Sequence, residues 1–540
     1  MPHSTFTCTE DGSTVSVLYL KPSTYIQFLL ANEPWLLLGG YRPGEKAREL
    51  LKCFWDAYRT EHPTHKVYDM ARRGEVDLQF TIPLVVHGDG GRTQKKAPME
   101  ILSIQPFVGL DTEGEDLWCH CQTPAKYSGK RNLDAMSLRT NGRNHSYLTH
   151  FLVFALATKR YPSNPGLLQA LIAEVMDDLG EACKNGFMVG TQKWHVAVLG
   201  MKGDMEWHAK IGLLERSYQN VGTANFKMCC HLCEAGSFNY PFEHYSVSAS
   251  WVSTMYRSVP WRQQRLPFTA VPYEDWNSGK ASSWFKGDPF HIFRLGICRN
   301  FLASAVIMLC LEGLFDGPGD GTAIQDRLDR AWGCFSLWSQ TFNYTLSGVR
   351  SFSRQKLHFG TMSSFPFIGC KGSDSVILLR WLRFQAGLLL GQHPTVSCLK
   401  HIIKACDNGL AFQGYHRHGI FLRPSCRDRL SKACKGFLKS YAFLAEIALN
   451  NQQTLFAQIP KAHALCHVFV NLELSRLRSD CLALNPGCWD CSMSEDFVGR
   501  VSRQSRRVSS RELSATTMRM YLIKTRFLIQ RYKKEHHPRR

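Results

Sequence analysis

The sequence lacks the features of a secreted or membrane-spanning protein. The segment Met1 to Cys8 has neither a basic start nor an apolar stretch, so we expect no signal peptide. The longest apolar run, Phe301 to Leu311, contains Ser304 and is too short to span a bilayer. A reducing compartment is then the default, in which the 20 cysteines are metal ligands or buried thiols before they are disulfides. We expect no membrane partner.

The sequence also lacks an internal repeat, and residues 1–75 contain no paired Cys/His finger and no helix-turn-helix. What the chain has in excess is positive charge, because 65 Lys and Arg against 45 Asp and Glu give a formal charge of +20. Much of it is local: Ser494 to Arg540 carries 13 basic against 4 acidic residues. This balance favours a polyanionic partner such as nucleic acid, although a merely soluble basic tail is the alternative.

The order of elements indicates the fold class. Apolar runs of strand length cover 78–87, 99–107 and 149–158, and a helical pattern covers 164–184. A fourth apolar run, His195 to Gly200, follows. Strand, strand, strand, helix, strand is the order of the ribonuclease H-like fold, so we predict an α/β protein with such a mixed-sheet core, interrupted by a large α-helical insertion. The expected division is an N-terminal region (1–75), the first part of the core (76–205), the insertion (206–480), the last core helix (481–512) and a basic tail (513–540).

Two carboxylates follow predicted strands. Asp89 comes after the first strand and Asp204 after the fourth, and each has a glycine before it. Two carboxylates brought close together repel unless a cation lies between them. Mg²⁺ or Mn²⁺ would bind such a pair and stabilise charge on a phosphoryl group. Either aspartate alone is typical of a turn, so the prediction depends on their joint placement.

A second group of residues has the chemistry of a zinc site. Cys230-x-x-Cys233 can hold one side of a zinc ion, although it is also compatible with a redox or buried pair. His463-Ala-Leu-Cys-His467 places two imidazoles on one face of a helix, and Cys488-Trp-Asp-Cys491 offers a second thiol pair. Either pair completes a four-ligand site, and the spacing does not choose between them. Cys229 is a surplus thiol.

Two further acidic segments precede helices. Asp288-Pro-Phe-His291 has the pattern of a helix N-cap followed by proline at the first position. Ser494 could cap another helix, with Glu495 and Asp496 in its first turn. A carboxylate there could complete a metal-binding trio with the two strand-end aspartates, or be a surface acid favoured by the helix dipole.

In this order, the motifs resemble the catalytic core of eukaryotic cut-and-paste DDE/D transposases, most closely the CACTA-like group. The segment from Val196 to Leu213 resembles the family's second-Asp segment, with Cys230-x-x-Cys233 after it. Asp288-x-x-His291 matches a [Cys/Asp]-x-x-His element, and Pro460-Lys-Ala-His463-Ala-Leu-Cys-His467 matches a Pro-Lys followed by His-x-x-x-His. The third acid of the family lies on a later helix, for which Glu495 is the candidate and Asp496 the reserve.

The resemblance implies metal-dependent DNA strand cleavage and strand transfer, with Asp89, Asp204 and Glu495 holding Mg²⁺ or Mn²⁺. It also implies structural Zn²⁺, DNA as partner, a nuclear location and association with a second copy of the chain. One departure is the missing DNA-binding module in residues 1–75. The alternative function is a catalytically inactive copy, a zinc-stabilised DNA-binding or interaction protein that keeps the transposase fold.

Overall fold

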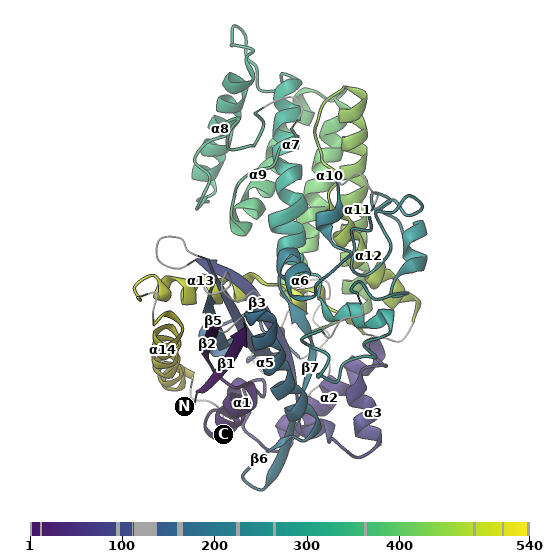
Figure 1. The fold of residues 1–540 in the computed structure, drawn as a ribbon. Helices are drawn as coiled ribbons and strands as arrows, with labels where there is room; N and C mark the ends of the chain where they lie inside the picture. Colours follow the sequence, from purple (N-terminus) through teal and green to yellow (C-terminus); the bar gives the residue numbers. More distant parts are fainter. Residues whose placement is uncertain are drawn as a thin grey trace, which may run out of the picture.

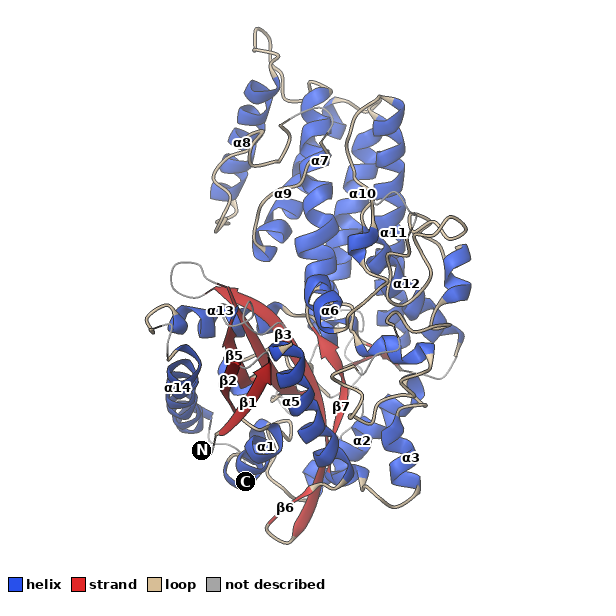
Figure 2. Ribbon diagram, viewed as in Figure 1, coloured by secondary structure: helices blue, strands red, loops and turns tan. Residues whose placement is uncertain are grey.

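The computed structural model describes residues 3–10, 13–92, 98–110, 112, 138–158, 166–222, 227–262, 266–360, 364–478, 482–509 and 512–536. Within them the protein is a mixed α/β structure with two hydrophobic cores. One core lies around a sheet, and the other lies among long helices that stand together on one side of it (Figures 1 and 2).

A five-stranded mixed sheet with the order β5-β4-β3-β7-β6 organises the first core. The strands span Thr81–Arg92 (β3), Pro98–Pro106 (β4), Phe151–Ala157 (β5), Phe187–Val189 (β6) and Gln192–Lys202 (β7). β3 pairs antiparallel with β4 and parallel with β7, while β4 also pairs antiparallel with β5. β6 forms a short antiparallel hairpin with β7. The central strands are buried on both faces, which is why they are almost continuously apolar.

The structure differs from the prediction at the end of β3. Asp89 does not follow this strand but lies within it, because β3 continues to Arg92 in an antiparallel ribbon in which Asp89 is opposite Ile101. The pairing with β7 ends earlier, at His87 and Lys202. β3 is a central strand that contains Pro83, and its register with β7 is irregular between Leu84 and Val86. Asp89 therefore projects from a ribbon that extends past the end of β7.

Helices from both ends of the chain cover the sheet. Their bounds are Pro22–Asn32 (α1), Glu45–Glu61 (α2), Lys66–Arg72 (α3), Ser146–Thr149 (α4), Leu167–Lys184 (α5), Ser492–Ser505 (α13) and Leu513–His536 (α14). A separate hairpin of β1 (Ser4–Glu10) and β2 (Ser13–Tyr19) packs against β5. In α14, Tyr521 is fully buried, and its hydroxyl contacts that of Tyr25 at 3.0 Å. Residues 513–536 of the predicted basic tail thus form a packed helix (Figure 1).

The second core is formed by helices from the middle of the chain. They span Phe290–Ile297 (a π-helical turn, η8), Cys298–Leu311 (α7), Ile324–Thr341 (α8), Gly372–Gln392 (α9), Ser397–Phe412 (α10), Pro424–Asn450 (α11) and Pro460–Leu477 (α12). Phe290–Leu311 is long and apolar enough to cross a membrane by length and composition alone, but 78% of its most apolar window is buried inside the protein. It is the central helix of this core (Figure 2).

The predicted range 206–480 is not helical throughout. After the short helix α6 (Met205–Ile211), the described residues up to 289 contain only 3₁₀ turns, at Tyr218–Asn220 (η5), Ser250–Thr254 (η6) and Gly279–Trp284 (η7). Aromatic rings order this stretch, as where Phe268 stacks on Trp284 at 5.8 Å. Both of these rings belong to the sheet core rather than to the helical one. This segment therefore ties the two cores together at the end of β7.

Candidate carboxylate site and Cys/His cluster

A buried cluster of two cysteines and two histidines lies at the edge of the helical core. Cys230 and Cys233 come from the loop after α6, and His463 and His467 lie one turn apart on α12. The Sγ–Nε2 distances are 3.3 Å for Cys230–His467, 3.3 Å for Cys233–His463 and 3.4 Å for Cys233–His467. The two Nε2 atoms are 3.1 Å apart. A tetrahedral zinc ion requires about 3.5 Å between S and N ligands and about 3.3 Å between N ligands.

The four side chains thus present a donor set that could bind a metal such as zinc. In the metal-free arrangement, burial and the neighbouring Cys230 raise the pKa of Cys233. Burial opposes ionisation of Cys230, but its hydrogen bond with Cys233 and the two histidines lower its pKa. Trp251 packs against both imidazoles, with ring centroids 4.5 and 4.7 Å away, and fixes their orientation. No sequence spacing indicated this tryptophan.

The alternative thiol pair lies elsewhere. Cys488 Sγ donates to the carbonyl of Ile420 at 3.6 Å, and Cys491 Sγ donates to the carbonyl of Trp489 at 3.7 Å. Both thiols are buried, which raises the pKa of each. The geometry therefore selects the histidine pair as the partner of Cys230 and Cys233.

The predicted acids lie near one another at the end of the sheet. Asp89 is on β3, Asp204 is the N-cap of α6 directly after β7, and Glu495 is in the first turn of α13, which packs against β3. Burial, the charge of Glu495 and a hydrogen bond with it, and then Asp204, raise the pKa of Asp89. Burial and the charges of Asp288 and Asp204 raise the pKa of Glu495, although its hydrogen bond with Asp89 acts in the opposite sense. The two acids therefore resist being ionised together, because they are buried and lie close to other acid charges.

Asp204 has a structural role as well. Its Oδ1 accepts the backbone N–H of Trp207 at 2.7 Å and caps α6. The Trp207 ring lies directly over Gly88, where a Cβ atom would come within 1.9 Å of Cζ2. Only glycine fits at this position. The residue before Asp89 is thus in contact with the helix that begins at Asp204, and this packing sets the separation of the two aspartates.

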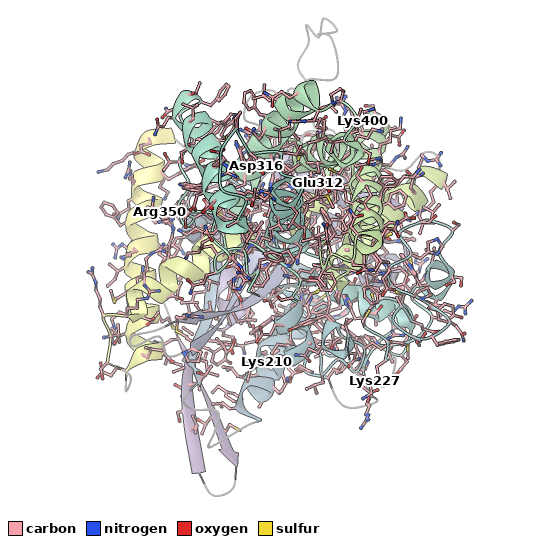
Figure 3. The ribbon with its side chains drawn as sticks, turned by 90° about the horizontal axis from the view of Figure 1, so that it is seen from above. Lys210, Lys227, Glu312, Asp316, Arg350 and Lys400 are labelled. Atoms are coloured by element: carbon pink, nitrogen blue, oxygen red, sulfur yellow. The ribbon has the colours of Figure 1, made fainter. Side chains whose placement is uncertain are left out.

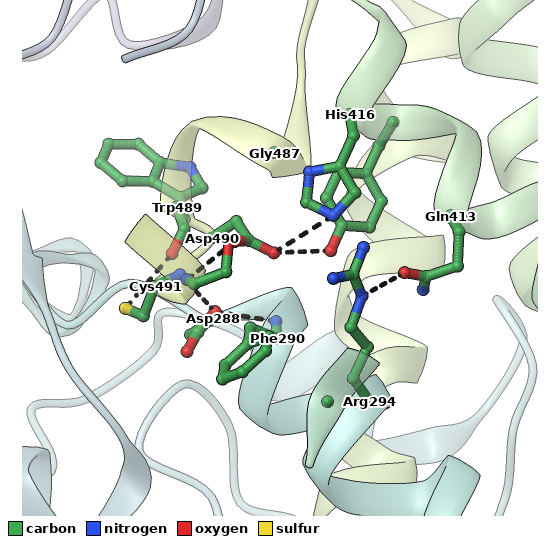
Figure 4. Close-up of polar contacts among 12 residues, drawn as sticks. Asp288, Phe290, Arg294, Gln413, His416, Gly487, Trp489, Asp490 and Cys491 are labelled. Carbon is green, nitrogen blue, oxygen red and sulfur yellow. Dashed lines mark hydrogen bonds and ion pairs between the residues drawn. The ribbon is translucent and has the colours of Figure 1, made fainter. Parts of the chain in front are cut away.

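Asp288 and His291 join the acid cluster. Asp288 accepts from His291 Nδ1 at 2.6 Å. It also accepts from the backbone N–H of Cys491 at 2.9 Å (Figure 4). His291 Nε2 lies 3.4 Å from Glu495 Oε1. Burial lowers the pKa of His291, but Asp288, Asp204 and Asp89 outweigh it and raise the pKa overall. The N-cap interpretation also holds, since Asp288 Oδ1 accepts the N–H of Phe290 at 2.8 Å.

The loop before α13 is held from the helical core. Asp490 accepts from the Tyr415 hydroxyl at 2.6 Å and lies 3.7 Å from His416 Nε2 (Figure 4). Its backbone carbonyl accepts from Lys202, at the end of β7, at 2.7 Å. The reserve acid Asp496 is occupied differently, because it pairs with Arg500 at 2.6 Å and accepts from Ser146 at 2.7 Å. Glu495, not Asp496, is therefore the acid that meets Asp89.

The two groups of candidate ligands differ in how closely they are packed. In the Cys/His cluster, the four ligand atoms lie within 4.8 Å of one another. Within the described residues, no other set of three or more His, Cys, Asp or Glu side chains is packed this tightly. No protein-family model matches the chain, and no curated protein matches it. The function is therefore inferred from these residues.

Proposed function

We propose that this protein is a transposase-derived nuclease that uses Mg²⁺ or Mn²⁺ to cleave DNA strands and transfer their ends. The observation that carries the proposal is the convergence of Asp89, Asp204 and Glu495, which are separated by up to about 400 residues in the chain. Their order and their supporting elements, a first strand, a later parallel strand and a late helix, are those that the resemblance to DDE/D transposases implies.

The sheet topology supports an RNase H-like interpretation of the first core. The order β5-β4-β3-β7, with β7 parallel to β3 and connected through α5, is the arrangement expected of that fold. On this interpretation, the region between α6 and the loop before α13 is an insertion. Its ends come together because α12 carries His463 and His467 back to Cys230 and Cys233. Structural zinc would clamp this junction.

The donor set at the end of the sheet suits a hard divalent cation. Three carboxylates offer only oxygen ligands. Burial first, and neighbouring acid charges second, raise the pKa values of Asp89 and Glu495, and a cation would stabilise their ionised forms. A bound Mg²⁺ or Mn²⁺ ion supplies Lewis-acid stabilisation of phosphodiester charge and activates the attacking hydroxyl. The chain itself holds the acids in place, through the α6 cap at Asp204 and the contact of His291 with Glu495.

DNA is the proposed substrate and partner. Arg503, Arg506 and Arg507 are exposed at the end of α13, the helix that carries Glu495. The neighbouring α14 exposes further basic side chains, including Arg519 and Lys524. Backbone phosphates bound by these groups would release counterions, so the affinity should fall steeply with added salt. A nuclear location and a second copy of the chain belong to the same proposal.

The test is a nicking assay on supercoiled DNA with Mg²⁺ or Mn²⁺, comparing the wild type with Asp204→Asn. Asparagine keeps the N-cap of α6 but loses the charge, so the fold should be retained. We expect the rate to fall roughly a thousandfold, which corresponds to about 4 kcal/mol of transition-state stabilisation. Glu206→Gln is the matched control, because Glu206 is exposed in the first turn of the same helix. Equal rates for Asp204→Asn and the wild type would remove the catalytic role.

A second candidate is a catalytically inactive, zinc-stabilised DNA-binding or interaction protein. It is favoured by the difference in packing, since the Cys/His atoms are close enough for a metal while the three acids are less tightly grouped. Calorimetric titration with Mn²⁺ separates the two functions. Absence of Mn²⁺ binding at millimolar concentration, together with salt-sensitive DNA binding, would support the inactive protein.

A further inference from the structure

A cavity of about 470 Å³ opens beside Asp204, between the end of the sheet and α12. Its wall includes Asp204 and Asp288 on one side and His463 and His467 on the other. A single metal ion fills a small part of such a volume. Cavities of roughly 300–1,000 Å³ are typical of sites for small organic ligands. The space is therefore large enough for a nucleotide-sized molecule in addition to zinc.

The carboxylates that line this cavity already have partners. Glu61 accepts from Ser475 Oγ at 2.6 Å, and Glu274 accepts from Thr64 Oγ1 at 2.9 Å. Asp204 caps α6, and Asp288 binds His291. Glu61 and Glu274 therefore have partners of their own, apart from the acids proposed to hold a cation.

A lysine in the same wall differs from these carboxylates. Lys461 is in the first turn of α12, and within the described part of the chain no hydrogen bond or ion pair holds its ammonium group. Its stem passes over Gly296, where a Cβ atom would come within 2.6 Å of the lysine Cδ. Burial and the charge of Arg299 lower the pKa of this half-buried side chain, while Asp204 and Asp288 act in the opposite sense and lie at the same end of the cavity. It is available to an anion.

Aromatic side chains supply the rest of the wall. Phe285 and Trp489 are buried against the cavity, and the partly exposed Tyr256 also lines it. Lys286 lies over the Trp489 ring at 4.7 Å and donates to the Tyr273 hydroxyl at 2.9 Å. Tyr256 has a φ of 59°, a left-handed conformation that is costly for a tyrosine and is characteristic of functional sites. A largely apolar wall that includes aromatic side chains, beside the Lys461 ammonium group, suits a planar base that carries a phosphate.

We infer that this cavity binds a nucleotide unit, with its base against the aromatic wall and its phosphate at Lys461. The nucleotide is either a free nucleoside monophosphate or an unpaired nucleotide of a DNA strand, since both present the same base and phosphate. Binding of a nucleotide that belongs to a DNA strand rests on the proposed function, whereas binding of a free nucleotide does not. No divalent ion is needed for either, so binding can be measured apart from cleavage.

The experiment is calorimetric titration of the zinc-loaded full chain with 2′-deoxyadenosine 5′-monophosphate, without Mg²⁺ or Mn²⁺. We expect saturable binding, and we expect Lys461→Met to weaken it about tenfold, as for loss of one charge-assisted hydrogen bond. Lys461→Met should leave the weaker binding of deoxyadenosine unchanged, whereas Trp489→Leu should weaken both ligands. Lys400→Met is the control, because Lys400 is exposed on α10 in the helical region (Figure 3) and does not line the cavity. Zinc content and thermal unfolding verify that each variant is folded.

Competition identifies the source of the nucleotide. A duplex with unpaired 3′ nucleotides that displaces the monophosphate, while a fully paired duplex does not, assigns the site to a DNA strand. Displacement by free nucleotides alone assigns it to a soluble ligand. The inference is overturned if the wild type shows no saturable binding up to ~5 mM monophosphate, or if Lys461→Met and Trp489→Leu both bind it as the wild type does. A wild type that binds nucleotide but never nicks DNA would contradict the proposed function and leave this site intact.

Discussion

The sheet core and the helical core differ in how closely their candidate metal ligands are packed. In the helical core, the thiols and imidazoles lie at distances close to those of a zinc tetrahedron. In the sheet core, Asp89 and Glu495 meet, but Asp204 caps a helix and the trio is less tightly grouped. Imidazole and thiol side chains carry no obligatory charge and can be packed together without a metal. Carboxylates repel one another, so their close approach needs a cation or a proton. The distances in the structure are therefore stronger evidence for a zinc site at the Cys/His cluster than for a cation site at the acids.

Removing the Cys/His cluster should have the largest effect, and it should fall on the helical core. We expect His463→Ala to lose stoichiometric zinc and to lower the free energy of unfolding by roughly 5 kcal/mol, because metal binding contributes directly to folding. Elemental analysis and thermal unfolding measure the two quantities. Cys229→Ser is the control, since this buried neighbour is outside the cluster and should keep its zinc. A metal-free wild type that is well folded would contradict the prediction.

Mild acid should instead weaken the sheet core, through His65. This residue is fully buried, its Nδ1 accepts the Val67 N–H at 3.2 Å, and its Nε2 lies 3.3 Å from the Val198 carbonyl of β7. The ring is held neutral, and burial lowers its pKa from 6.5 to about 4. Between these values only the unfolded chain binds the proton, so the stability contributed at neutral pH is lost as the pH falls from about 6.5 to about 4.

The expected loss is at most ~3 kcal/mol over this pH range. Chemical denaturation at several pH values measures it, by comparing the wild type with His65→Asn. Asparagine can still cap α3 but does not titrate. Acid also releases zinc from both proteins, so the difference between their pH profiles isolates the histidine. Parallel profiles would show that His65 does not provide the pH sensitivity of the sheet core.

Much of the sheet was predictable, because β3, β4, β5 and β7 are apolar runs buried on both faces. The paired extension of β3 through Asp89 was not, since glycines within a ribbon have the composition of a loop. Helix α14 was not predicted, because its many basic side chains obscure the apolar periodicity of the narrow buried face that includes Met518 and Tyr521. The choice of His463 and His467 over the thiol pair depends on contacts across more than two hundred residues, which spacing does not encode.

A methyl group added at Gly88 should have the smallest effect, and it tests whether the acid site can be disturbed without the Cys/His cluster. In Gly88→Ala the new Cβ would meet the Trp207 ring, which must move together with the start of α6. We expect a loss of ~2 kcal/mol in stability from overpacking, and a lower nicking rate because Asp204 shifts away from Asp89. Gly90→Ala is the matched control on the same strand, because a Cβ atom at Gly90 would meet no other atom within 4 Å. Thermal unfolding, nicking rate and zinc content should be measured for both variants. Unchanged zinc in Gly88→Ala would show that the acids can be disturbed alone. A loss of zinc would show that α6 couples the two sites. The Cys/His cluster would then not keep its geometry independently of the acids.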